Sequence, residues 1–285
     1  MIFHRVIPKL DIKGPNLVKG VHLEGLRVLG KPEVFANKYF ANGADELIFQ
    51  DTVASLYQRS QLLEIVSRTA EAIFIPLTVG GGVRSLQDIE DVLRAGADKV
   101  AINTAAVRSP EFIDSAVRVF GSSTIIVSID VISHSSRGYI VYTENGREDA
   151  KICALDWARE VEERGAGEIL LTSIDREGTG EGYDLELIKQ ISKNTSIPVI
   201  GHGGAGSAND MVKALTESKA HAVSASSIFH YHLLKGLKNN AGYEEEGNCD
   251  FLKKEVGFKK FGTHRHSIES IKKDLLESGV PVRID

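Results

Sequence analysis

Two ten-residue stretches, PLTVGGGVRS at residues 76–85 and PVIGHGGAGS at residues 198–207, share one pattern at an offset of 122 residues. Each is a short apolar run, which predicts a buried strand, followed by glycines that permit a tight turn. Two further pairs keep nearly the same offset: GADELIF from residue 43 with GAGEILL from 165, and ADKVAINT from 97 with AHAVSASS from 220. The repetition predicts two similar halves, at about residues 1–120 and 121–232.

Apolar runs and helical stretches alternate along both halves. Stretches such as 61–72 and 86–95 carry apolar residues at three- and four-residue spacing, which is typical of amphipathic helices. Continuous apolar strands between helices predict a parallel sheet. Strands are expected at residues 6–10, 46–49, 76–79, 99–102, 124–129, 168–172, 198–200 and 222–225. Eight such units predict the α/β class and one (β/α)8 TIM barrel; a doubly wound open sheet is the alternative, but no GxGxxG follows the first strand.

Composition sets the class of protein. The 285 residues are 42% hydrophobic and 26% charged, with a net charge of −5, so the chain has no global attraction to nucleic acid or to an anionic membrane. No run approaches the length of a membrane-spanning helix, and the first residues lack the apolar core of a signal peptide. Two cysteines, Cys153 and Cys249, are too few for a disulfide framework or a cysteine-based zinc site. We expect a cytoplasmic protein.

Phosphate-binding turns are expected after the third and fourth strands of each half. The first half has glycines at 80–82 and then Asn103 and Thr104; the second has glycines at 203–204 and then Ser226 and Ser227. Glycines let the backbone approach an anion, and exposed N–H groups with hydroxyl or amide side chains supply donors. The alternative is that these glycines only form tight turns. Because the donors recur in both halves, we expect a ligand with a phosphate at each end.

Two acidic residues end equivalent strands. Asp11 follows the first expected strand and Asp130 follows the fifth, so they should face each other across the mouth of a barrel. Two carboxylates facing one substrate can divide the roles of general acid and general base if their surroundings separate their pKa values. Either residue alone would be explained as a turn cap; the symmetric pair favours catalysis. Trp157 and His230 are expected to be packing residues.

An ordered series of motifs resembles the cyclase subunit of imidazole glycerol phosphate synthase. The series is KLDIKGPNLVKG (9–20), FQDTVAS (49–55), TVGGGV (78–83), GADKVAINTAAV (96–107), RGAGEILLTSIDREGTGEGYD (164–184) and GGAG (203–206), and the resemblance resumes at GVPVRID (279–285). The sister isomerase of the same pathway shares the half-barrel repeat and the paired aspartates, but it fits AINTAAV and GAGEILLTSIDREGT less well.

The resemblance implies a (β/α)8 barrel that takes ammonia from a glutaminase partner, in a heterodimer. Ammonia would react with a bis-phosphorylated ribulosyl aminoimidazole carboxamide nucleotide to give imidazole glycerol phosphate and aminoimidazole carboxamide ribotide. No metal or organic cofactor is implied. By motif position the acid–base pair is Asp11 and Asp130, Lys19 reaches over the substrate, one phosphate lies on Gly82, Asn103 and Thr104, and the other on Gly178, Gly204, Ser226 and Ser227, next to Glu177.

The resemblance also implies a gate for ammonia at the opposite end of the barrel. Arg5, Glu46, Lys99 and Glu168 begin the first, second, fourth and sixth strands. Two cations alternating with two anions could form a closed ring of ion pairs, although ordinary surface salt bridges are the alternative. Ammonia has to cross as the neutral molecule, because removing water from ammonium is costly. The pore lining should therefore be apolar or only weakly polar.

Three residues depart from the family pattern. Lys9 stands where the family usually has Cys, Glu177 where it has Asp, and His202 where it has Ser. If Lys9 points inward, it should lower the pKa of Asp11. The departures hint at a paralogue that conducts ammonia from a glutaminase to a separate enzyme for surface-sugar amidation, in which a third protein would take part. The presence of both Asp11 and Asp130 favours the cyclase.

One stretch, at about residues 233–266, has no counterpart in the family pattern. It holds KNNAGYEEEGNCD and then the basic run KKEVGFKKFGTHRH, before a last helix at about 267–279. A solvated insertion is one interpretation, and a lid or a docking surface for a third protein is the other.

Overall fold

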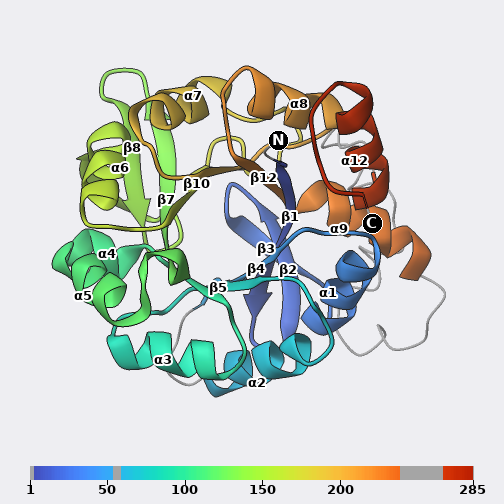
Figure 1. The fold of residues 1–285 in the computed structure, drawn as a ribbon, viewed down its shortest axis with the longest axis horizontal. Coiled ribbons are helices and arrows are strands. Elements are labelled where there is room, and N and C mark those ends of the chain that lie inside the picture. The colour runs from blue at the N-terminus through green and yellow to red at the C-terminus, as the bar shows by residue number, and fades with distance from the viewer. Residues whose placement is uncertain (1–2, 54–58, 238–265, 285) are drawn as a thin grey trace.

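The computed structural model describes residues 3–53, 59–237 and 266–284. A closed ring of eight parallel strands occupies the centre, and the helices surround it (Figure 1). The barrel strands are β1 (Arg5–Lys13), β4 (Leu47–Asp51), β5 (Leu77–Gly80), β6 (Lys99–Ile102), β7 (Ile125–His134), β10 (Glu168–Ser173), β11 (Val199–His202) and β12 (Ala222–Ala225). Pairing of β1 with β12 and of β7 with β10 closes the ring. The predicted (β/α)8 barrel is confirmed, and each of the eight expected strands overlaps an observed one.

Helices follow the barrel strands and bury one face against them. They are α1 (Pro32–Ala41), α2 (Arg59–Ala70), α3 (Leu86–Arg94), α4 (Thr104–Arg108), α5 (Glu111–Phe120), α6 (Ala154–Glu163), α7 (Leu185–Asn194), α8 (Ala208–Thr216), α9 (Ser227–Leu237) and α12 (Ile268–Glu277), with a 3₁₀ turn at Ser122–Thr124. Ser85 caps α3 and Ser207 caps α8, each in a capping box with the aspartate three residues on. None of the helices described is long and apolar enough to cross a bilayer.

Two antiparallel hairpins extend the barrel and were not expected from the sequence. Strands β2 (Asn16–Val21) and β3 (Glu24–Gly30) continue from β1, and strands β8 (Gly138–Thr143) and β9 (Glu148–Cys153) continue from β7. The two hairpins thus occupy equivalent places in the two halves. Both rise beyond the carboxyl ends of the parallel strands, where they can wall a site. The insertion expected at residues 233–266 begins within α9 (Ser227–Leu237). Nearly all of the rest lies outside the described residues.

Residues of each barrel strand alternate between the helices and the barrel interior. On β1, Val6 and Leu10 belong to the large core between sheet and helices, whereas Ile7 belongs to a separate cluster inside the barrel. We call this inner cluster the apolar layer; it consists of Ile7, Ile48, Ala101, Ile126, Leu170, Ile200 and Ala222. The barrel interior is therefore closed across its middle by side chains that carry no charge.

Trp157 on α6 is the largest side chain that is fully buried, as expected for a packing residue. Replacing Trp157 by alanine should lower the free energy of unfolding by about 3–5 kcal/mol, because it removes a large apolar contact and leaves a cavity. Chemical denaturation measures the loss. Phe74→Ala is the matched control: this ring is 85% exposed, so the change should be within about 0.5 kcal/mol of zero. A small effect at Trp157 would contradict the packing shown by α6.

Candidate functional site

A cavity of about 340 Å³ opens at the carboxyl end of the barrel strands. We call it the chamber. Its wall combines inward-facing strand residues with the loops that follow: Lys9, Gln50, Asp51, Gly81, Gly82, Arg84, Asn103, Thr104, Arg108, Ser128, Asp130, Glu144, Arg147 and Thr172 are among its lining residues. Active sites of such barrels lie at this end, because loops from different strands can be varied there without disturbing the sheet.

Asp130 on β7 faces the chamber. Its carboxylate accepts hydrogen bonds from Asn103 Nδ2 at 2.9 Å and from Ser128 Oγ at 3.4 Å. Burial raises the pKa of Asp130 above its usual range, and its neutral hydrogen-bond donors and the more distant Lys9 only partly offset this. Asp130 therefore holds its proton more firmly than an exposed aspartate would.

Removing the amide at Asn103 should raise the pKa of Asp130 further, because Asn103 donates to the ionised carboxylate. An upward displacement of the Asp130 carboxyl titration in Asn103→Leu, followed by carbon-13 NMR, is the expected result. Asn145→Gly is the matched control: Asn145 also lines the chamber, glycine tolerates its positive φ of 58°, and within the described part of the structure Asn145 makes no hydrogen bond to Asp130. Equal titration curves in the two variants would contradict this account of Asp130.

Asp11 on β1 is held by two lysines. Lys9 Nζ lies 2.6 Å from Asp11 Oδ1, and Lys19 Nζ on β2 lies 3.4 Å from Asp11 Oδ2. Burial by itself would raise the pKa of Asp11, but Lys9 and Lys19 outweigh it and hold this pKa well below its usual range. The expectation that an inward-pointing Lys9 lowers the pKa of Asp11 is confirmed. β1 and β7 stand opposite each other in the closed strand order, so the two aspartates come from opposite sides of the barrel.

The other two departures from the family pattern join the same buried group. Lys19 forms an ion pair with Glu177, and His202 Nε2 lies 3.5 Å from Glu177 Oε1. Although burial opposes ionisation, Lys19 lowers the pKa of Glu177 to about 2, and burial lowers the pKa of His202. Lys9, Glu177 and His202 thus surround Asp11 and Lys19 in one network that links the chamber wall to a second pocket.

The predicted binding residues of the first half come together in the chamber. Gly82, Asn103 and Thr104 all line it, and Gly81 and Gly82 have positive φ values of 96° and 67°. A Cβ at Gly81 would collide with the backbone of Asp51. The tip of the β8–β9 hairpin docks at the start of α4, because the Glu144 N–H donates to Thr104 Oγ1 at 3.1 Å. The backbone here can approach an anion closely.

The corresponding residues of the second half line a smaller hollow. Its wall includes Glu177, Gly178, His202, Gly203, Gly204, Ser226 and Ser227. We call it the second pocket. Its volume is about 10 Å³, which is room for roughly one water molecule. Ser226 Oγ donates to the carbonyl of Lys9 at 2.7 Å. Among the described residues, one oxygen of Glu177 and Nδ1 of His202 find no hydrogen-bond partner, and Nε2 of His202 has only its 3.5 Å contact with Glu177. A phosphate would therefore need the wall of this pocket to move outward.

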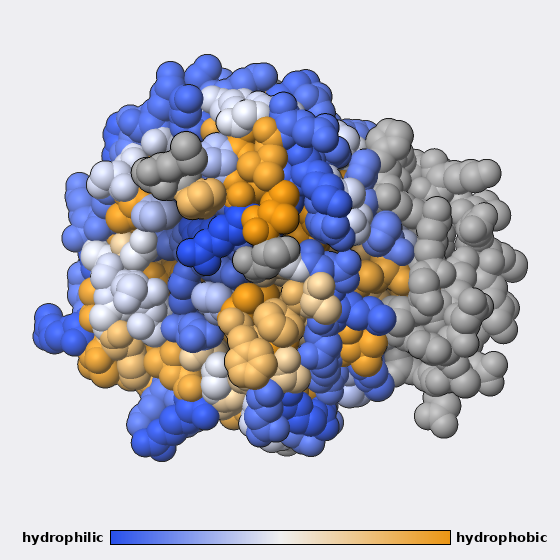
Figure 2. Space-filling model, turned by 45° about the vertical axis from the view of Figure 1, so that its right-hand side comes forward, coloured by the Kyte–Doolittle hydropathy of each residue, from blue (hydrophilic) through white to orange (hydrophobic). Residues whose placement is uncertain are grey.

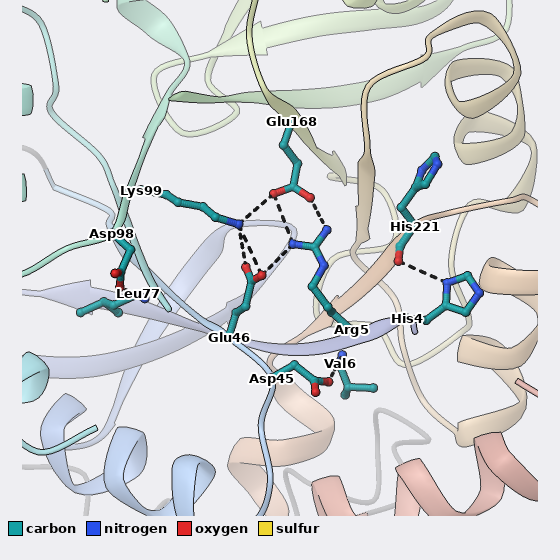
Figure 3. A network of polar contacts seen from close by, with 10 residues as sticks. All are labelled: His4, Arg5, Val6, Asp45, Glu46, Leu77, Asp98, Lys99, Glu168 and His221. Atoms are coloured by element: carbon teal, nitrogen blue, oxygen red, sulfur yellow. Dashed lines mark hydrogen bonds and ion pairs between the residues drawn. The ribbon is translucent and has the colours of Figure 1, made fainter. Parts of the chain in front are cut away.

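At the opposite end of the barrel, four charged side chains form a closed ring of ion pairs (Figure 3). Arg5 contacts Glu46 at 2.8 Å and also Glu168, while Lys99 contacts Glu46 at 3.1 Å and Glu168 at 3.4 Å. We call these four residues the charged ring. The glutamates are 8–9% exposed and the cations 20–24%, so these are partly buried pairs and not the surface salt bridges of the alternative interpretation.

The charged ring, the apolar layer and the chamber follow one another along the strands at two-residue steps. β1 supplies Arg5, Ile7 and Lys9 in that order, and Lys99, Ala101 and Asn103 follow the same order at β6. Equivalent triplets come from Glu46, Ile48 and Gln50 and from Glu168, Leu170 and Thr172. The layer between charge and chamber is apolar, as a path for neutral ammonia requires.

Several chamber residues were not singled out from the sequence. Gln50, Ser128 and Thr172 lie two residues from another inward-facing position, so strand alternation could have found them. Arg108 and Arg147 come from α4 and from the end of the β8–β9 turn, and Arg108 pairs with Glu144 and Glu148 at 3.1 Å. The place of Arg147 and the pairing of Arg108 depend on a hairpin that was not expected, although Asn145-Gly146 between two β-rich runs is a hairpin signal that could have found it.

Residues 5–235 match the family described as "Histidine biosynthesis protein". A relative from Legionella pneumophila, named "Imidazole glycerol phosphate synthase subunit HisF", is 59% identical over 202 residues, which is 71% of this chain and 95% of the relative. Relatives of the same name from Alkaliphilus metalliredigens and Trichormus variabilis are 47% and 49% identical over 81% of this chain, covering 92% and 91% of their own lengths.

Proposed function

The chain belongs to the histidine biosynthesis protein family, among its imidazole glycerol phosphate synthase cyclases, and on that premise we propose how its residues carry the reaction. It is a lyase in which ammonia reacts with a bis-phosphorylated ribulosyl-formimino aminoimidazole carboxamide nucleotide. The products are imidazole glycerol phosphate and aminoimidazole carboxamide ribotide. The observation that carries the proposal is the spatial order along the barrel strands, in which the charged ring is followed by the apolar layer and then by the chamber.

Asp11 on β1 and Asp130 on β7 would carry the acid–base chemistry from opposite sides of the barrel. Burial raises the pKa of Asp130 and the two lysines lower the pKa of Asp11, so at any pH a larger fraction of Asp130 than of Asp11 is protonated. Such a difference is what a general acid and a general base require of each other. We therefore assign the proton donor to Asp130 and the ionised side to Asp11.

The two phosphates would lie at the turns of the two halves. Gly82, Asn103 and Thr104 would hold one phosphate at the chamber wall. Gly178, Gly204, Ser226 and Ser227 would hold the other once the second pocket widens, and Lys19 is the nearby cation that such an anion would draw from Glu177. The half-barrel organisation, at about 1–120 and 121–232, explains why one ligand meets two similar turns.

Ammonia would come from a glutaminase subunit in a heterodimer, docked around the charged ring. Large apolar side chains are exposed near that end of the barrel, where helices end and strands begin: Phe3, Phe74, Val119, Leu276 and Ile284 are 41–85% exposed. Apolar patches also interrupt the largely hydrophilic face drawn in Figure 2. Exposed apolar side chains around a polar centre are typical of a protein interface. A cytoplasmic location accords with such a biosynthetic complex.

Two other functions remain as alternatives to the cyclase: an ammonia conduit and the sister isomerase. The relatives named above carry the cyclase name, so they favour the cyclase over a conduit for surface-sugar amidation, and over the sister isomerase. A third protein has no support from them. The experiment is direct: the purified chain, given the ribulosyl nucleotide and an ammonium salt at alkaline pH, should consume substrate without any partner, measured as loss of absorbance. No consumption by the folded protein would refute the cyclase; consumption without ammonium would indicate the isomerase.

A further inference from the structure

Lys9 lies between Asp11 and the chamber. Among the described residues that line the chamber, β1 contributes Lys9 and not Asp11. Both side chains point into the barrel, since they stand two residues apart on one strand, and both are buried, at 4% and 2% exposure. The Lys9 ammonium contacts Asp11 Oδ1 at 2.6 Å, so the lysine covers the carboxylate on the chamber side.

The position of Lys9 is fixed from two directions. Asp11 accepts from its Nζ, and Ser226 Oγ from the start of α9 donates to its backbone carbonyl at 2.7 Å. Directly below it on β1 is Ile7 of the apolar layer, so Lys9 stands where that layer ends and the chamber begins. Ammonia that crosses the apolar layer would meet the substrate beside this ammonium group.

We infer that the β1 side of the active site is the Lys9–Asp11 ion pair, in which Lys9 is the member that meets the substrate and Asp11 is the residue that positions it. The inference rests on the proposed function. Lys9 offers N–H donors to a substrate oxygen that gains negative charge when ammonia adds to the neighbouring carbon, and its part in this step is hydrogen bonding alone. No covalent bond to Lys9 is formed.

Other charges around Asp11 fit this arrangement. The groups that face it are Lys9 on β1, Lys19 on β2, Glu177 after β10, His202 on β11 and His230 on α9. Lys19 is engaged by Glu177 as well as by Asp11, so it is shared with the second pocket. Among these described groups, Lys9 is the cation whose ion pair is with Asp11 alone, which makes it the one that Asp11 can orient.

Four variants test the inference: Lys9→Met, Lys9→Arg, Asp11→Asn and the double variant Lys9→Met/Asp11→Asn. With ammonium as the nitrogen source, Lys9→Met should lower kcat by about 10²-fold, the effect of losing one preorganised donor, whereas Lys9→Arg should retain part of the activity. Because the two residues act as a unit, the double variant should be no slower than the slower single variant.

Two outcomes would overturn the inference. If Asp11 meets the substrate itself, Lys9→Met uncovers it, so this variant keeps or exceeds the wild-type kcat while Asp11→Asn is inactive; that pattern overturns the inference. So does a double variant whose loss is the product of the two single losses. Lys9→Met leaves a buried carboxylate with one fewer cation; if it fails to fold, the double variant and Lys9→Arg still decide, because neither leaves that carboxylate uncompensated.

A measurement without turnover separates this inference from the proposed function. Carbon-13 NMR of the Asp11 carboxyl, assigned through Asp11→Asn, should show an ionised group throughout the accessible acid range in the wild type and an upward displacement of its titration in Lys9→Met. Identical titrations would refute the pairing. Wild-type protein that shows the pairing but leaves the ribulosyl nucleotide unchanged would refute the cyclase instead.

Discussion

Replacing Asp130 by asparagine should lower the ammonium-supported kcat by about 10²–10⁴-fold, the usual contribution of a general acid or base. The amide cannot give up a proton, yet it can still accept the hydrogen bond from Asn103 Nδ2, so the geometry of the chamber is kept. Steady-state kinetics with the ribulosyl nucleotide and ammonium measure the loss. An Asp130→Asn variant with wild-type kcat would remove Asp130 from the mechanism.

The same substitution should stabilise the fold at neutral pH. Burial raises the pKa of Asp130 above its value of 3.8 in the unfolded chain, so the folded protein binds this proton more tightly. Stability from this group is present below pH 3.8 and is lost as pH rises through the folded pKa. Asparagine resembles the protonated form, so Asp130→Asn should melt at a higher temperature than the wild type at pH 7 and at nearly the same temperature below pH 3.8.

Asp11→Asn should change stability in the opposite direction, although it also lowers turnover. The pKa of Asp11 is lowered by Lys9 and Lys19 against the effect of burial, so its contribution to stability is present above pH 3.8 and is lost as pH falls through the folded pKa. The amide leaves Lys9 buried without its carboxylate, at a cost of about 3–5 kcal/mol near neutral pH. Thermal melts of both variants between pH 3 and pH 8 check the pair; shifts of the same sign at pH 7 would contradict these environments.

The barrel could be predicted because its signal is local and repeated. Apolar strands such as residues 99–102 and 222–225 agree with β6 and β12 to the residue, and the offset of 122 places equivalent turns in both halves. Strand alternation then decides which residues face inward. Asp11 and Asp130 could be placed on opposite strands by counting alone.

The β2–β3 hairpin could not be predicted in this way. Between β2 and β3 the chain turns at His22 and Leu23, with positive φ values of 52° and 63°, and a leucine is not a residue that announces such a turn. The contacts that hold this turn are long-range: the His22 N–H donates to the Glu177 carbonyl at 2.9 Å. Sequence periodicity holds no information about a partner 155 positions away.

The contacts of the buried charge network could be predicted from the sequence only within one strand. Lys9 and Asp11 are two residues apart on one strand, so their contact follows from strand geometry, and its effect on the pKa of Asp11 could be stated in advance. Glu177 and His202 come from other elements, and their convergence on Lys19 needs the closed barrel. The second pocket is likewise narrower than a symmetric repeat suggests, because these two side chains fill its wall.

Changing the net charge of the charged ring should uncouple glutamine from cyclisation. The intact ring is neutral, with two cations and two anions. Lys99→Met leaves a net charge of −1 and removes the contacts of Lys99 with Glu46 and Glu168. Ammonium would then be held at the ring, and it cannot cross the apolar layer without losing its water. In the complex with a glutaminase subunit, product formed per glutamine hydrolysed should fall about tenfold, the change that about 1.4 kcal/mol produces.

Ammonium-supported turnover separates a gate from a catalytic role. The ring lies at the other end of the barrel from the chamber, so Lys99→Met with external ammonium and no partner should keep a near wild-type kcat. Lys273→Met is the matched control, since Lys273 forms an exposed pair with Glu269 on α12 and is not a member of the ring. Loss of ammonium-supported activity in Lys99→Met would mean that the substitution disturbs the barrel itself and would contradict the gate.

Charge and shape can be told apart with a second substitution. Glu168→Gln alone leaves the ring with a net charge of +1, and Lys99→Met/Glu168→Gln restores neutrality while opening the same contacts further. If the net charge of the ring controls the passage of ammonia, the neutral double variant should recover part of the coupling that each single variant loses. If the four side chains act only as a mechanical seal, the double variant should couple worst of the three, because it retains only the contacts of Arg5 with Glu46 and with the remaining amide.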